Sequence, residues 1–213
     1  MRRISQPLGM KPNIVLITGR LWRLWPSLIT AALALTGTLL GAQEPKDDQR
    51  AYVKKQVQFD RWQDLTKSRP ETRSDTFKVD QSLLAPWQIR RVREIGKANH
   101  GVTTQYILSK ADKPSSAKEI LRVSVTRCAT RADAEEALID HLSGIQRADA
   151  KLIEEESLLL GDLAVHIPGT PEAAICFVRG NVLVCVENAG EKPAAELREV
   201  TRKIDESLKS VAR

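Results

Sequence analysis

The chain has 213 residues, of which 42% are hydrophobic and 28% charged, as expected of an ordinary globular protein with one or two domains. Aromatic residues make up only 4% and there are three cysteines, which excludes an aromatic-rich binding surface and a scaffold built from disulfides. The net charge of +6 does not indicate a nucleic-acid partner, because five basic residues and no acid precede residue 43. The other 171 residues carry 28 basic and 27 acidic side chains, so no nucleic acid is expected as a partner.

Residues 1–42 have the pattern of an export signal. A basic stretch is followed by residues 24–42, which carry no charge and end in small residues, and the sequence becomes polar at Gln43. The first interpretation is a cleaved signal peptide, which places the mature protein in the periplasm or outside the cell. The alternative is an uncleaved signal that tethers the protein to the membrane. The sequence leaves Met1 and Met10 open as the start.

Residues 43–85 are polar and mixed in charge, and they predict a partly ordered linker. An α+β domain is expected over 86–213. Its first element is expected to be a helix near 83–98, where isoleucine and valine recur every three residues. This helix would have a basic side suited to an anionic surface, formed by Arg90, Arg91, Arg93 and Lys97.

From Gly101 onward the pattern alternates between strands and helices. We expect strands at 102–110, 119–128 and 163–167, a hairpin at 174–186, and helices that begin near Thr130 and Pro193. The order β-β-α-β-β-β-α predicts an α+β fold in which an antiparallel sheet carries two helices on one face.

The hairpin predicts a disulfide. Gly180-Asn181 suits a two-residue type II′ turn, which would place Cys176 opposite Cys185 in a pair without hydrogen bonds. The Cα atoms of such a pair lie about 4.5 Å apart, within the range that a disulfide bridges. A pairing that involves Cys128, or three free thiols, remains open. Cys128 on the polar face of its strand could also share a site with His166.

The two faces of the hairpin differ. The bulkier face is assigned to the core and carries Ile175, Phe177, Val182, Val184 and Val186. The opposite face is apolar as well, and the strand at 119–128 adds polar side chains to it. We expect this face either to be covered by residues 51–66 or to bind a partner. The candidate partner-binding residues are Val178, Leu183, Arg122 and Thr126.

The sequence contains none of the common catalytic, phosphate-binding or zinc-binding motifs. His100, His141 and His166 are scattered along the chain, so no metal site, cofactor or catalytic residue is expected.

The turns around Leu160-Gly161-Asp162 and Phe177-Val-Arg-Gly-Asn181, followed by an amphipathic helix, resemble a small α+β domain of secreted bacterial proteins of unassigned function. The resemblance covers roughly residues 100–210 and implies no catalytic residue. The first functional hypothesis is an exported, non-enzymatic domain that binds a protein or cell-envelope partner. The alternatives are a small exported hydrolase or redox enzyme without a readable motif, and a membrane-tethered envelope protein.

Overall fold

The computed structural model describes residues 46–67, 72–98, 100–110, 118–145, 149–154 and 160–211. All of them belong to one compact unit, Glu44–Arg213. The export signal, the tether at 24–42 and the choice of start codon therefore lie outside the described residues. Among the helices that are described, none combines the length and the apolar character needed to cross a bilayer.

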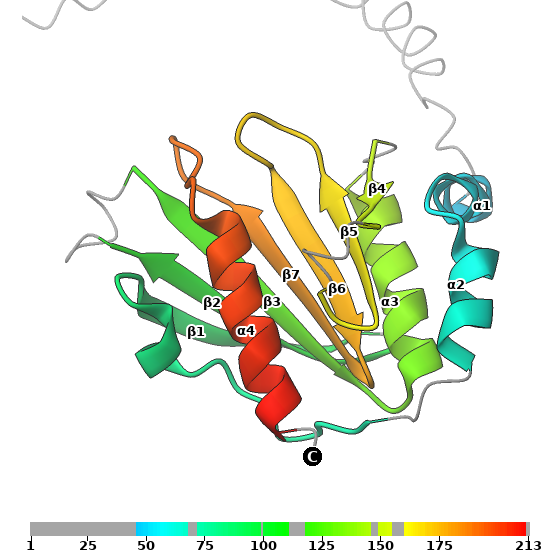
Figure 1. The fold of residues 1–213 in the computed structure, drawn as a ribbon, viewed down its shortest axis with the longest axis horizontal. Helices are drawn as coiled ribbons and strands as arrows, with labels where there is room; N and C mark the ends of the chain where they lie inside the picture. The colour runs from blue at the N-terminus through cyan, green and yellow to red at the C-terminus, as the bar shows by residue number, and fades with distance from the viewer. Residues whose placement is uncertain are drawn as a thin grey trace, which may run out of the picture. The chain divides into compact units, whose positions relative to one another are not determined.

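Seven antiparallel strands form one sheet in the order β1-β2-β3-β7-β6-β5-β4 (Figure 1). The strands are β1 Gln88–Ala98, β2 Gly101–Ser109, β3 Ile120–Cys128, β4 Lys151–Leu152, β5 Leu163–Ile167, β6 Ala174–Arg179 and β7 Val182–Asn188. The helices are α1 Lys46–Gln56, α2 Phe59–Lys67, α3 Arg131–Gly144 and α4 Leu197–Val211, together with the 3-10 turn η1 Gln81–Leu84. The α+β class is confirmed, and the strands β1 and β4 are additions to the expected order.

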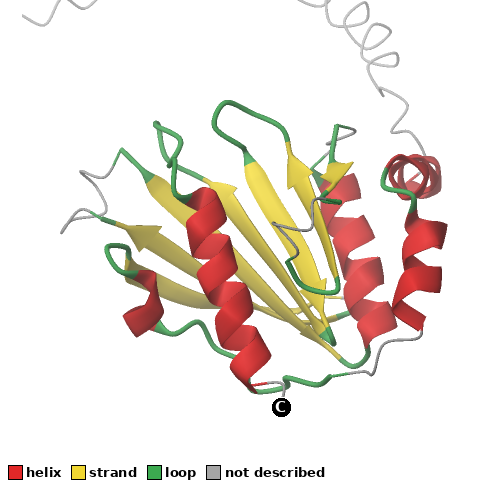
Figure 2. Ribbon diagram, viewed as in Figure 1, coloured by secondary structure: helices red, strands yellow, loops and turns green. Residues whose placement is uncertain are grey.

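Helices cover both faces of the sheet, which corrects the expectation that two helices lie on one face (Figure 1, Figure 2). Helix α4 lies in front of the sheet and α3 behind it. Phe177 and Val184 pack under α4, whereas Val178 and Leu183 belong to a second core with α3. The physical reason is visible in the hairpin, whose strands are apolar at nearly every position, as strands buried on both faces are.

The segment near 83–98, expected to be a helix, forms the edge strand β1 over most of its length. Its pairing with β2 shifts twice, between Ile89 and Arg91 and between Glu94 and Gly96. The first shift places Ile89 opposite Leu108 and Val92 opposite Tyr106, so residues three apart share a face. A β-bulge adds one residue to one strand of a pair in this way. The added residue changes the spacing of same-face residues from two to three, which resembles the spacing found in a helix.

The segment expected to be a polar linker contributes to both cores. Helices α1 and α2 bury Val53, Phe59 and Trp62 in the core on the α3 side. Phe77, which follows α2, is buried in the core on the α4 side. The domain therefore begins about 40 residues earlier than the sequence suggests. The two helices are short and mostly charged on the outside, which hides their few buried positions.

The predicted disulfide is present. Cys176 and Cys185 face each other across β6 and β7 with their Cα atoms 4.1 Å apart and are bonded to each other. The turn has the expected form, because Gly180 adopts a φ of +51°. Cys128 is a free, buried cysteine. A disulfide is consistent with an oxidising compartment of the kind that exported proteins enter.

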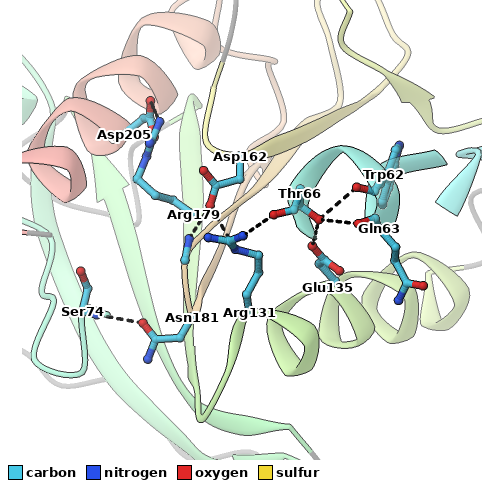
Figure 3. A network of polar contacts seen from close by, with 11 residues as sticks. Trp62, Gln63, Thr66, Ser74, Arg131, Glu135, Asp162, Arg179, Asn181 and Asp205 are labelled. Carbon is cyan, nitrogen blue, oxygen red and sulfur yellow. Dashed lines mark hydrogen bonds and ion pairs between the residues drawn. The ribbon is translucent and has the colours of Figure 1, made fainter. Parts of the chain in front are cut away.

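A buried polar network ties the β6–β7 turn to the helices (Figure 3). Arg179 donates two hydrogen bonds, of 2.6 and 3.0 Å, to the Asp205 carboxylate of α4. Asp205 also accepts from the Gly161 backbone N–H, and Asp162 accepts from the Gly180 N–H at 2.7 Å. The turns at Gly161-Asp162 and at Arg179-Gly180 are therefore tied to each other and to α4.

Asn181 completes this network on the other side of the turn. It is fully buried, and its side chain accepts from the Ser74 backbone N–H and donates to the Cys128 carbonyl, both at 2.8 Å. It also donates to the Asp75 carboxylate at 2.8 Å. Because all of these groups are satisfied, the burial of an amide costs little here.

Candidate functional site

A groove of about 530 Å³ lies on the α3 side of the sheet. Helix α3 packs mainly on β3, β6 and β7, so β1 and β2 extend beyond it. The wall of the groove is α3 and the floor is formed by β2, β3 and β7. We call this site the α3 groove; it is lined by Ile95, His100, Thr103, Gln105, Arg122, Ser124, Thr126, Ala137, Asp140, His141, Ile145, Leu183, Cys185 and Glu187.

The register of the strands explains the composition of the floor. Gln105 on β2, Ser124 on β3 and Cys185 on β7 follow one another across the sheet. In a parallel row, Thr103 lies opposite Thr126, and their hydroxyls are hydrogen-bonded at 2.9 Å. The floor therefore offers uncharged donors and acceptors that lead up to the disulfide.

Two histidine–carboxylate pairs stand at the groove. His100 Nε2 lies 2.9 Å from the Asp140 carboxylate, and His141 Nε2 lies 3.2 Å from Glu187 Oε1. The other oxygen of Glu187 lies 3.2 Å from Arg122 Nε. The negative charges of Asp140 and Glu187 are thus each met by a histidine or arginine side chain of the protein itself.

Burial by itself would raise the pKa of Glu187. The neighbouring His141 and Arg122 outweigh burial, so the pKa of Glu187 lies below its ordinary value of 4.5. A carboxyl whose pKa is lower in the folded state stabilises the fold fully above its ordinary pKa. That stabilisation is lost as the pH falls through the lowered value.

We therefore expect Glu187→Gln to reduce the acid sensitivity of the protein. Between about pH 6 and pH 3, the free energy of unfolding of the wild type should fall more steeply than that of the variant. Urea unfolding at a series of pH values measures both. If the free energies of unfolding of the two proteins change with pH in parallel, the ion pairs of Glu187 do not contribute to stability.

The cysteines provide no reactive thiolate among the described residues. Cys176 and Cys185 are bonded to each other, and burial raises the pKa of the Cys128 thiol to about 12. Cys128 also lies far from His166, because β7 and β6 separate their strands by at least roughly 14 Å. His166 pairs instead with Glu172 at 3.0 Å. The Cys128–His166 site considered from the sequence is not formed.

The structure divides the four residues proposed for partner binding. Val178 and Leu183 are buried in the core with α3, at 0% and 3% exposure, so they do not form an open face. Their cover is α3 itself, and residues from α1 and α2 join the same core. Arg122 and Thr126 do lie in the α3 groove, and so does the edge of Leu183.

Sequence reasoning missed the groove residues of α3 and β7, namely Asp140, His141 and Glu187. A signal for the groove existed in β3, whose Arg122, Ser124 and Thr126 alternate with buried Leu121, Val123 and Val125. A central strand with one polar face indicates that this face is partly open. The position of α3, which decides where it opens, is a tertiary property.

Comparison of the chain with protein families, curated proteins and solved structures finds no match.

Proposed function

We propose that the protein is an exported, non-enzymatic domain that binds an acidic segment of a protein partner in the α3 groove. The observation that carries this proposal is the charge distribution around the groove. The groove carboxylates Asp140 and Glu187 are paired with side chains of the protein itself, whereas Arg91 and Arg93 of the neighbouring β1 make no ion pair with any described residue.

Arg91 and Arg93 are exposed and lie on the groove side of the sheet, opposite Ile107 and Gln105 of β2. Among the described residues, neither arginine makes an ion pair. Arg122 lies opposite Ile107 on the next strand, so its guanidinium stands on the same face. Arginine pairs with carboxylates through two parallel hydrogen bonds, which suits recognition of aspartate or glutamate.

The remainder of the lining favours a peptide. Ile95 and Ile145 are large exposed apolar residues at the groove, at 53% and 38% exposure. Between them the floor offers hydroxyls and the Gln105 amide. Apolar positions beside hydrogen-bonding groups match a protein segment in which acidic and apolar side chains alternate.

Export is part of the proposal. The charge-free stretch at 24–42 and the Cys176–Cys185 disulfide both favour an oxidising destination, and the periplasm is the location we propose. N-terminal sequencing of the protein from its host should give a chain that starts near Gln43. If the protein is instead found in the membrane fraction with residues 1–42 retained, the signal is not cleaved and tethers the protein to the membrane.

The binding test uses peptides of random sequence displayed on phage. Selection on the wild type should enrich aspartate and glutamate, and charge reversal in Arg91→Glu/Arg93→Glu should weaken the selected peptides by at least about tenfold. The matched control is Lys55→Glu/Lys78→Glu, which makes the same charge change at exposed positions on other elements. Selection without acidic enrichment, or equal weakening in the control, would refute the proposal.

A further inference from the structure

We infer that reduction of the Cys176–Cys185 disulfide creates a binding site for a thiophilic d¹⁰ cation such as Zn²⁺. The inference rests on the position of His141 beside the disulfide and does not depend on the partner proposed for the groove.

Helix α3 brings His141 directly over the bridged strands. One imidazole nitrogen of His141 and the sulfurs of Cys176 and Cys185 all lie within 4.8 Å of one another. The Glu187 carboxylate, 3.2 Å from His141 Nε2, adds a negative charge next to them. Two thiolates, one imidazole and a nearby carboxylate form the donor set that zinc prefers.

The strand geometry fits this chelate. Zinc held tetrahedrally by bonds of about 2.3 Å keeps two sulfurs roughly 3.8 Å apart. Cys176 and Cys185 are directly opposed with a Cα separation of 4.1 Å, so both side chains can reach one ion without movement of the backbone. Cys185 lines the α3 groove, which gives the ion a path to the site.

The chemistry of the exchange balances with a dithiol as the reductant. The dithiol transfers two electrons and two protons, the bond between the two cysteine sulfurs breaks to give two thiols, and the reductant becomes a cyclic disulfide. The cation then displaces the two thiol protons and binds the resulting thiolates. In the oxidised protein the same sulfurs are bonded to each other and have no thiolate to offer.

The test titrates the protein with Co²⁺ after reduction by a phosphine, under anaerobic conditions. The reduced wild type should bind a single Co²⁺ and show sulfur-to-cobalt charge transfer with the visible bands of tetrahedral cobalt. The oxidised protein should show neither. Reduced Cys128→Ser is the matched control and should behave as the wild type, because Cys128 is not part of the cluster.

His141→Ala should weaken the affinity of the reduced protein for Co²⁺ and Zn²⁺ by at least about 10- to 100-fold. If the reduced chain is unfolded without metal, Zn²⁺ should restore the circular dichroism of the folded state in the wild type and not in His141→Ala. Absence of the tetrahedral spectrum and of refolding, equal affinity of His141→Ala, or loss of binding in Cys128→Ser would each overturn the inference.

Discussion

Asp205→Ala should destabilise the protein by about 3–5 kcal/mol, because it leaves the Arg179 guanidinium in the interior without its counter-ion. The Asp205 side chain is only 1% exposed, and it holds Arg179 through two hydrogen bonds while also accepting from the Gly161 backbone. The variant therefore loosens α4, β6 and the turn before β5 together. Urea unfolding, followed by circular dichroism, measures the change in the free energy of unfolding.

The neighbouring Glu206 provides the control. It lies on the outer side of α4 and pairs with Arg202 one turn earlier, with both side chains more than half exposed. Glu206→Ala should change the free energy of unfolding by no more than about 0.5 kcal/mol. Replacement of the buried pair by Arg179→Met/Asp205→Leu should recover much of the loss, since no charge is then buried. Equal effects of Asp205→Ala and Glu206→Ala would contradict the structural role of the pair.

Gly180→Ala should lower the free energy of unfolding by at least about 2 kcal/mol. Both the backbone conformation of Gly180 and the atoms packed around it disfavour a side chain at this position. Gly180 has a φ of +51°, and a Cβ atom built on it would lie 1.9 Å from the Thr72 carbonyl oxygen. The segment at Thr72 would have to move away, which disturbs the bonds of Asn181 to Ser74 and Asp75.

Gly144→Ala is the matched change at an open position. Gly144 is the last residue of α3, and a Cβ atom there meets nothing within 4 Å. We expect this variant to be neutral or more stable by up to about 1 kcal/mol. Thermal unfolding of both variants measures the difference in their stability. A Gly180→Ala protein that is as stable as the wild type would contradict the prediction and mean that the turn relaxes freely.

Local patterns were sufficient for the central part of the fold. The hairpin around Gly180-Asn181, its disulfide register and the cap of α3 at Thr130 depend on neighbouring residues, and the structure has them where the sequence predicts them. The terminal helix likewise shows its buried stripe, although Val211 at its end is exposed.

The predictions from the sequence were wrong where tertiary contacts determine the structure. The helix-like spacing of Ile89 and Val92 comes from a register shift that only the pairing with β2 reveals. Trp62 and Phe59 are buried because α3 provides a surface for α2, and no local pattern shows that surface. The same limit applies to the site. The polar face of β3 was visible in the sequence, but the meeting of His141 with Glu187 and the disulfide required the position of α3.

The bulges of β1 also bear on how the protein avoids aggregation. β1 and β4 are the edges of the sheet, and an unprotected edge is a template on which a strand of another molecule can add. β1 is bent twice and carries exposed arginines, and β4 at the opposite edge is only two residues long. In the part of the chain that is described, neither edge is both long and flat, so the native sheet resists growing into an intermolecular one.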